Sequence, residues 1–134
     1  MIKGIDHINI AVKDVDRVIT LFQKMGFQLI RRRTEGDLKG MAELKLPDDS
    51  VIYEISPVNP NFFDGKSGVR HIAFAVDDAQ KTFDELKAKG IKSREDKPTF
   101  YPEIGGSLFN CVDDDLDSFR VQFQDKKRKP SVSR

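Results

Sequence analysis

The 134-residue sequence has no tryptophan, only two histidines and a single cysteine, Cys111. One cysteine cannot form an internal disulfide, so we expect a reducing compartment, the cytoplasm. No apolar run approaches the roughly 18 residues that span a membrane. A predicted strand begins almost at the N-terminus, so we expect no signal peptide. The formal net charge is only +1, so we expect neither nucleic acid nor a membrane as partner.

What the sequence does contain is typical of a soluble globular protein, with 38% hydrophobic and 34% charged residues. This length is enough for one domain with a core of its own, and we predict that domain over residues 1–125. The remaining residues, 126–134, are basic and poor in apolar side chains, which predicts a disordered tail. An arm that binds nucleic acid is the alternative for this tail.

An internal repeat determines the predicted architecture. The segment that begins at Gly4 recurs 64 positions later at Gly68, and both histidines of the chain, His7 and His71, are among the matching residues. The same shift carries Gly26 onto Gly90, which gives seven identities across 23 positions. We therefore predict two similar modules, over residues 3–57 and 68–124.

Each module is predicted to run strand, helix, strand, strand, strand, which makes the fold class α+β. Asp14 is the predicted N-cap of the first helix, Asp77 or Asp78 that of the second, and a glycine ends each helix. Residues 91–99 are a poor strand candidate, and 100–106 are predicted to be a loop. The other elements are predicted strands at 5–12, 27–34, 40–46, 51–56, 69–76, 107–112 and 118–124, an acidic turn at 113–117, and apolar helix stripes of Val15, Val18, Ile19, Phe22 and Met25, and of Ala79, Phe83 and Leu86.

Alternation along the strands separates an apolar face from a polar one. The apolar stripe of each helix must cover the apolar face of its sheet, so the opposite face carries the polar side chains. Each module then offers one histidine on its first strand and one oxygen-bearing side chain on its last. If the modules are related by a pseudo-twofold axis, these groups converge, and they suit a divalent ion such as Zn, Ni, Co, Mn or Fe. The polar-face residues are His7, Glu43, Glu54, His71 and Gln122.

At these residues the sequence resembles the vicinal oxygen chelate superfamily, which includes glyoxalase I, methylmalonyl-CoA epimerase, extradiol dioxygenases and bleomycin-binding proteins. The resemblance covers about residues 3–124, and the segment from Gly68 to Asp78 matches the opening of the second module of that family. It implies that the sheets curl into a cup with the helices outside, and that His7, Glu54, His71 and Gln122 are the metal ligands. Family members pair modules within one chain or across two chains, so a homodimer is expected.

The resemblance also implies a function. We expect a lyase or isomerase of glyoxalase or epimerase type, in which a divalent metal ion helps to remove a proton next to a carbonyl of a small substrate, through an enediolate or enolate. The base would be Glu54, or Glu43 in the segment Gly40–Glu43, which resembles part of methylmalonyl-CoA epimerase. One departure bears on this expectation: many relatives have a glutamate where this chain has Gln122, which cannot accept a proton.

Several alternatives remain open at the level of sequence. The candidate substrate-binding residues are Asn9, Arg31, Arg33 and Arg120, although the two arginines at 31 and 33 also suit a solvated edge strand. The two histidines could serve packing alone. In that case the chain would be a non-catalytic small-molecule-binding or antibiotic-resistance protein of the same fold, without a metal.

Overall fold

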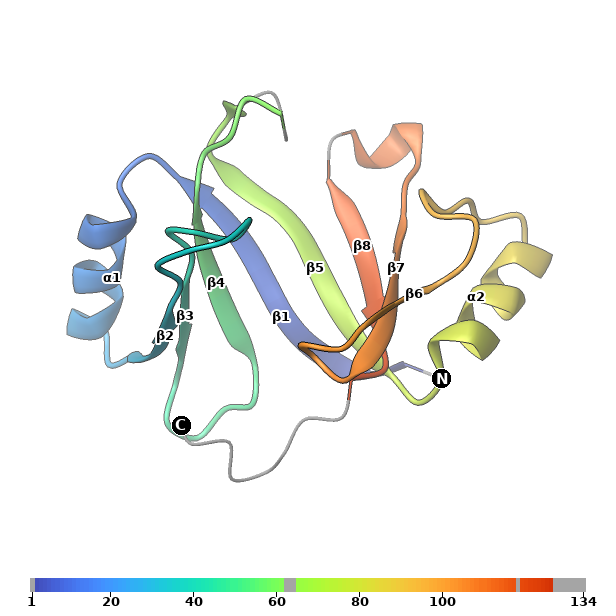
Figure 1. Cartoon of the computed structure of the whole chain (residues 1–134), viewed down its shortest axis with the longest axis horizontal. Helices are drawn as coiled ribbons and strands as arrows, with labels where there is room; N and C mark the ends of the chain where they lie inside the picture. Colours follow the sequence, from blue (N-terminus) through green and yellow to red (C-terminus); the bar gives the residue numbers. More distant parts are fainter. Residues whose placement is uncertain (1, 62–64, 118, 127–134) are drawn as a thin grey trace. The chain divides into compact units, whose positions relative to one another are not determined.

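The structure is a computed structural model that describes residues 2–61, 65–117 and 119–126. These residues form two compact units, one of residues 6–70 and one of residues 71–126 with residues 2–5. The elements follow the predicted order twice (Figure 1). They are β1 (Ile2–Val12), α1 (Val15–Lys24), β2 (Gln28–Arg32), β3 (Ala42–Lys45), β4 (Ile52–Pro57), β5 (Gly68–Val76), α2 (Ala79–Ala88), β6 (Thr99–Tyr101), β7 (Gly106–Cys111), the short 3-10 helix η2 (Asp114–Leu116) and β8 (Arg120–Gln124).

The predicted fold class is therefore confirmed: the chain is α+β, with two tandem β-α-β-β-β modules. In module one, β4 pairs with β1 in parallel and with β3 antiparallel, and β2 pairs with β3 antiparallel. Module two repeats this pattern: β8 pairs with β5 in parallel and with β7 antiparallel, and β6 pairs with β7 antiparallel. Each module is thus a mixed four-stranded arrangement whose first and last strands are parallel neighbours.

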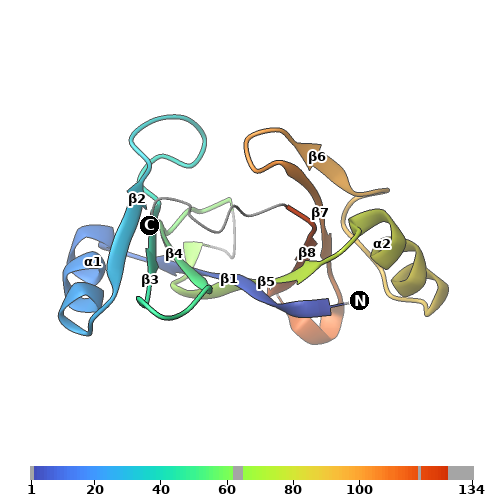
Figure 2. The ribbon, with the colours of Figure 1, turned by 90° about the horizontal axis from the view of Figure 1, so that it is seen from below.

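The core of module one lies between α1 and one face of β2, β3 and β4, as Figures 1 and 2 show. Val15 and Ile19 of the helix are buried against Leu44 and Ile55, and Ile10 and Val12 of β1 pack against this cluster. Aromatic rings extend the core, with the Phe22 and Phe27 ring centroids 4.8 Å apart and those of Phe27 and Tyr53 5.2 Å apart. The predicted helix stripe is correct except for Met25, which is 59% exposed at the end of α1.

Module two builds its core in the same way, between α2 and the facing sides of β7 and β8. Phe109 is its centre, with ring centroids 5.2 Å from Phe83 and 5.3 Å from Phe123. Cys111 is buried in the same cluster. Burial there raises the pKa of its thiol, and the nearby carboxylate of Glu95 raises it further. The thiol therefore behaves as a small apolar group in the core.

The helix ends follow the sequence predictions. Asp14 and Asp78 are the N-caps of α1 and α2, and each side chain accepts a hydrogen bond from a backbone N–H three residues later. Gly26 and Gly90 follow the two C-caps with φ of +103° and +83°, where other residues would be strained. No helix among the described residues is long and apolar enough to cross a membrane.

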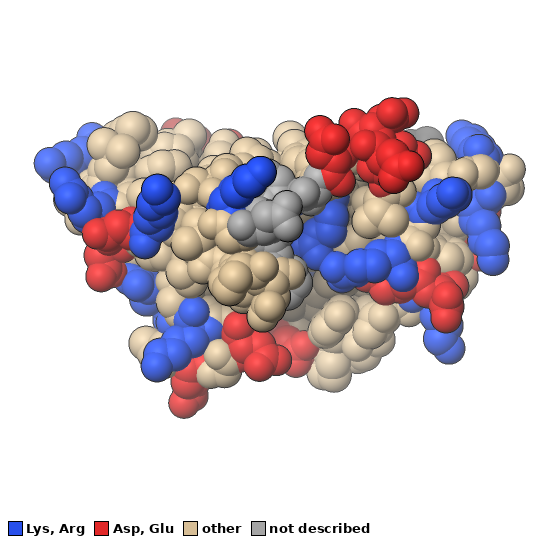
Figure 3. Space-filling view, turned by 90° about the horizontal axis from the view of Figure 1, so that it is seen from above, with Lys and Arg blue, Asp and Glu red and all other residues tan. Residues whose placement is uncertain are grey.

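Two local predictions need correction. Phe100 and Tyr101 were predicted to lie in a loop, but they belong to β6, which pairs with β7. The predicted acidic turn contains η2, whose Asp114 and Asp115 are exposed. Figure 3 shows acidic side chains gathered at the upper right of the face that it draws. The domain boundaries and the tail stay predictions, and residues 127–134 of the tail lie outside the described residues.

Asp125, which directly follows β8, connects this strand with the starts of α2 and β7. Its Oδ2 accepts a hydrogen bond from the backbone N–H of Ala79, 2.8 Å away, and its Oδ1 accepts one from that of Ser107, 2.7 Å away. These N–H groups open α2 and β7, so one carboxylate fixes the start of both elements. Hydrogen bonds to a charged acceptor are stronger than neutral ones.

We therefore predict that Asp125→Ala lowers the free energy of unfolding by about 3 kcal/mol, because two N–H groups lose a charged acceptor. Urea unfolding followed by circular dichroism measures this change. Asp48→Ala, which removes an exposed aspartate from the turn between β3 and β4, is the matched control and should have little effect. Equal midpoints for the two variants would contradict the clamping role of Asp125.

Candidate functional site

His7 on β1 is held in a defined orientation by its neighbour in the sequence. Its Nδ1 lies 2.7 Å from Oδ2 of Asp6, and both side chains are buried. An ionised carboxylate only accepts hydrogen bonds, so Nδ1 carries the proton and the electron pair of the neutral ring is on Nε2. A metal-binding histidine usually donates one ring N–H to a carboxylate and binds the ion with its other ring nitrogen.

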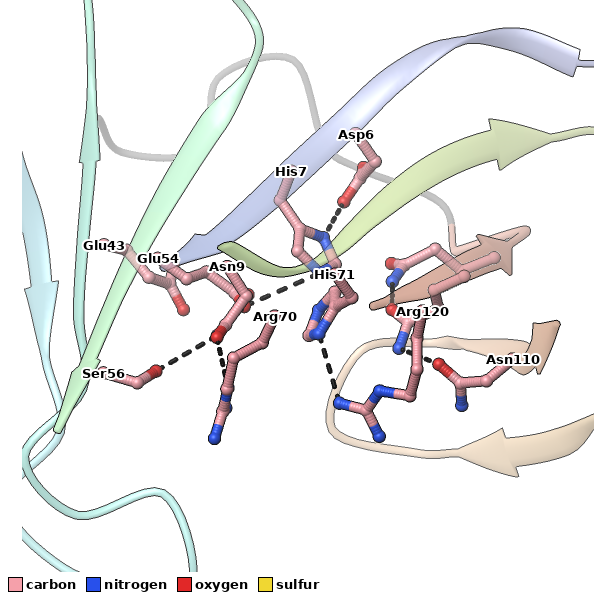
Figure 4. Close-up of polar contacts among 12 residues, drawn as sticks. Asp6, His7, Asn9, Glu43, Glu54, Ser56, Arg70, His71, Asn110 and Arg120 are labelled. Carbon is pink, nitrogen blue, oxygen red and sulfur yellow. Dashed lines mark hydrogen bonds and ion pairs between the residues drawn. The ribbon is translucent and has the colours of Figure 1, made fainter. Parts of the chain in front are cut away.

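Glu54 on β4 lies opposite that nitrogen. Its Oε1 is 3.6 Å from Nε2 of His7 and accepts a hydrogen bond of 2.9 Å from Nδ2 of Asn9. Asn9 also donates to Oγ of Ser56 at 3.1 Å, and its Oδ1 accepts from Nε of Arg70 at 2.8 Å (Figure 4). Asn9 is therefore a buried partner of Glu54, and its role in substrate binding stays a prediction.

Arg70 adds a positive charge to this network. Burial lowers the pKa of its guanidinium, and the carboxylate of Glu54 acts in the opposite direction. An arginine keeps its proton under all ordinary conditions. The guanidinium of Arg70 and the carboxylate of Glu54 therefore attract each other.

Glu43 on β3 stands directly across from Glu54 in the antiparallel pair. Its carboxylate is 3.7 Å from Nη2 of Arg33, and its side chain is 17% exposed. Arg31 is the register partner of Glu43 on β2 and is exposed. Arg33 therefore contacts a carboxylate of its own chain, whereas Arg31 is exposed on the edge strand β2. The role of both arginines in substrate binding stays a prediction.

Module two carries the second histidine. Nδ1 of His71 on β5 lies 3.3 Å from Nη2 of Arg120 on β8 (Figure 4). A guanidinium only donates hydrogen bonds, so this contact uses the electron pair of Nδ1. An ion bound at that nitrogen would therefore displace Arg120. Arg120 contacts this predicted ligand, and its role in substrate binding stays a prediction.

Gln122 occupies in module two the position that Glu54 occupies in module one. Glu54 pairs with Asn9 on the first strand, Gln122 pairs with Ala73, and these partners are 64 residues apart. By the same register, Asn110 on β7 stands opposite Gln122 as Glu43 stands opposite Glu54. Two carboxylates in one module thus correspond to two amides in the other.

The amides of module two form a buried hydrogen-bonded chain. Gln124 Nε2 donates to Gln122 Oε1 at 2.7 Å, and Gln122 Nε2 donates to Asn110 Oδ1 at 3.1 Å. Glu95 accepts at the far end, from the backbone N–H and from Nδ2 of Asn110, both at 2.8 Å. Burial raises the pKa of Glu95, but the hydrogen bonds from Asn110, from its own N–H and from Arg94 outweigh it and lower the pKa overall.

The donor atoms of module one fit a divalent transition-metal ion. With Nδ1 protonated, Nε2 of His7 and Oε1 of Glu54 face each other with electron pairs 3.6 Å apart, an arrangement that repels unless a cation or a proton lies between them. Imidazole nitrogen with carboxylate oxygen is a donor set that Zn, Fe, Co, Ni and Mn all accept.

Sequence reasoning missed several residues that support this chemistry. Strict alternation put Asp6 on the face opposite His7, whereas both are buried and bonded to each other. Glu95 fell in a segment without a regular pattern. The signals that could have identified them were weak: a carboxylate adjacent to the repeated histidine, and an acidic residue within a poor strand candidate.

Comparison with known proteins agrees with this reading of the fold. Residues 4–123 match the family described as the Glyoxalase/Bleomycin resistance protein/Dioxygenase superfamily. Methylmalonyl-CoA epimerase from Mycobacterium tuberculosis is similar in structure, with a TM-score of 0.79 and 17% identity over 98% of this chain and 93% of that chain. A variant of the Streptomyces coelicolor methylmalonyl-CoA epimerase, solved in complex with 2-nitronate-propionyl-CoA, gives 0.76 and 22% over 96% of this chain and 100% of that chain.

A hypothetical protein from Bacillus halodurans is also similar, with a TM-score of 0.76 and 20% identity over 95% of this chain and 96% of that chain. All three identities are below 25%, so these structures establish the fold and leave the substrate open. The family match spans both β-α-β-β-β modules and nearly all of the described residues. The chain therefore belongs to the Glyoxalase/Bleomycin resistance protein/Dioxygenase superfamily.

Proposed function

We propose that the chain is a divalent-metal-dependent enzyme that removes a proton from the carbon next to a carbonyl group of a small substrate. The observation that carries this proposal is the group of His7, Glu54 and Glu43 in module one. His7 and Glu54 are oriented as ligands by Asp6 and Asn9, and a second carboxylate lies directly across the strand pair.

In the proposed site, His71 and Gln122 of module two complete the ligand set begun by His7 and Glu54. Such an ion, when bound, supplies a Lewis acid that stabilises negative charge on the carbonyl oxygen of the substrate. The ion would be Zn, Ni, Co, Mn or Fe, since the donor set suits all of them. The repeat supports this assignment, because it places one histidine at the same register position in each module.

We assign the two carboxylates different tasks. Glu54 is fixed by Asn9 and faces His7, which suits a ligand. Glu43 contacts the guanidinium of Arg33 at the longer distance of 3.7 Å, through one of its two carboxylate oxygens. A carboxylate that is ionised, held close to the site and partly exposed can accept a proton from substrate carbon. Glu43 is therefore the proposed base.

Proton transfer in this proposal takes place on the side of module one. The corresponding positions of module two hold Asn110 and Gln122, and neither amide accepts a proton at ordinary pH. Inversion at a carbon atom needs bases on both of its faces, whereas a glyoxalase-type shift needs only one. The residues therefore favour a one-base reaction, with epimerisation as the less supported version.

The proposed substrates are small carbonyl compounds with neighbouring oxygen atoms. Acyl-CoA thioesters are one class to test, because epimerases of similar fold were solved with methylmalonyl-CoA and with 2-nitronate-propionyl-CoA. Hemithioacetals of 2-oxoaldehydes are the other class, because they need only one base. The homodimer stays a prediction.

Metal binding is the first prediction. The purified chain, loaded with Ni²⁺, Co²⁺, Zn²⁺, Mn²⁺ or Fe²⁺ and desalted, should retain about one ion per chain, and His7→Ala should lose it because a nitrogen ligand is removed. Elemental analysis measures the content, and circular dichroism verifies that the variant is folded. Gln23→Ala, an exposed change on α1, is the control. Absence of all five ions from the wild type would overturn the proposal in favour of a metal-free binding protein.

Loss of the base is the second prediction. Glu43→Gln should slow exchange of the substrate α-proton with D₂O by about 10²–10⁴-fold, because the amide cannot accept the proton. Nuclear magnetic resonance follows the exchange, with methylmalonyl-CoA and the hemithioacetal of methylglyoxal and glutathione as substrates.

The metal content of Glu43→Gln should stay unchanged, which separates the loss of the base from the loss of a ligand. Glu35→Gln, an exposed glutamate in the turn after β2, provides the matched control and should exchange at the wild-type rate. Exchange at the wild-type rate in Glu43→Gln itself would remove Glu43 from the role of base.

A further inference from the structure

The amide chain of module two has a single direction, and Glu95 sets it. A carboxylate has no proton to donate, so both of its oxygens must accept, and Asn110 must turn its side-chain nitrogen toward them. The other end of that amide, Oδ1, then faces Gln122. An amide without such a charged neighbour could adopt either orientation, because its two ends have nearly the same shape.

The next amide follows from the first. Asn110 Oδ1 can only accept, so Gln122 presents its Nε2 to it, at 3.1 Å. Oε1 of Gln122 is thereby turned to the opposite side, where it accepts one hydrogen bond from Gln124. A carbonyl oxygen has two lone pairs, so this oxygen keeps one for a further partner.

The amide chain ends at Gln124 in another hydrogen-bond acceptor. Gln124 is 3% exposed, and its Oε1 has no hydrogen-bond partner among the described residues. In this amide chain, each side-chain –NH₂ group is on the side toward Glu95, and each side-chain carbonyl oxygen is on the side away from it. The end remote from the carboxylate therefore presents oxygen atoms, which suit a cation or a donor group and oppose an anion.

We propose that Glu95 is a positioning residue, which acts through Asn110 to make Gln122 offer its oxygen, and not its amide nitrogen, to the metal ion. This inference rests on the proposed function, because it assumes that Gln122 is a ligand. Module one needs no such device for its own ligand, since both oxygens of Glu54 are acceptors. Neutral Gln122 needs one, because its –NH₂ group turned toward a cation would repel it.

Glu95→Gln tests the proposal because it changes the hydrogen-bonding character with almost no change in shape. Its Oε1 can still accept from the backbone N–H of residue 110, but its new –NH₂ group would face Nδ2 of Asn110. Asn110 would turn its oxygen toward residue 95, and Gln122 would turn its nitrogen toward the ion. We expect the affinity for Co²⁺ to fall by about 10–100-fold, the range found when groups that orient metal ligands are altered.

A second substitution should reverse this effect. In Glu95→Gln combined with Asn110→Asp, the carboxylate at 110 accepts from the new amide and also from Nε2 of Gln122. The oxygen of Gln122 is again turned toward the ion, so most of the affinity should return. Titration with Co²⁺, followed by visible absorption, measures affinity and reports on the ligands. Glu85→Gln, an exposed change on α2, is the matched control.

The outcomes separate the two proposals. If the wild type binds Co²⁺ and Glu95→Gln binds it equally well, the positioning role is wrong while the proposed function stands. If the double variant binds Co²⁺ no more tightly than Glu95→Gln, the positioning role is also wrong. A purely structural role of Glu95 would give no recovery of affinity in the double variant. If the wild type binds neither Co²⁺ nor any of the other four ions, the proposed function and the positioning role both fail. If the side-chain amide resonances of Asn110 and Gln122 stay unchanged in metal-free Glu95→Gln, the hydrogen-bond directions inferred for the amide chain are wrong.

Discussion

The packing of one helix against one face of each module determines where all the polar groups go. Once Val15 and Ile19 are buried against β3 and β4, and Phe83 against β7, the two-residue period of the strands leaves the opposite face to the remaining side chains. Those side chains are largely buried as well: His7, Asn9 and Ala11 are less exposed than Ile8, Ile10 and Val12 of the same strand. A polar row with so little access to water must be paired internally, which explains the density of hydrogen bonds around Glu54 and Gln122.

The parts of the molecule that the sequence predicted are those that depend on local rules. Caps at Asp14 and Asp78, glycines after both helices, and the faces of β1, β4, β5 and β8 follow from capping and alternation alone. The repeat added the register, and with it the positions of both histidines. Asp6 and Glu95 escaped prediction for a physical reason: each acts through a side-chain contact that departs from strand periodicity. Asp6 and Glu95 were therefore harder to identify from the sequence than His7 and Asn110, which they contact.

The two modules share a backbone pattern but differ in what their site residues can do with a proton. Glu43 and Glu54 stand opposite each other in module one, and Asn110 and Gln122 in the same places of module two. Amide and carboxylate oxygens can both approach a cation, but of the two only the carboxylate accepts a proton at ordinary pH. In the proposed function, this difference between the modules favours a one-base reaction.

In both modules a charged side chain contacts the third-strand residue that pairs with the last strand. The sign of that charge differs between the modules. In module one, Arg33 follows β2 and faces the carboxylate of Glu43. In module two Glu95 lies before β6, close to the isolated bridge between Ser93 and Cys111, and it contacts Asn110. A carboxylate attracts a cation, whereas a negatively charged acceptor fixes the direction of an amide. The opposite charges in the two modules therefore match the side chains that they contact, a carboxylate in module one and an amide in module two.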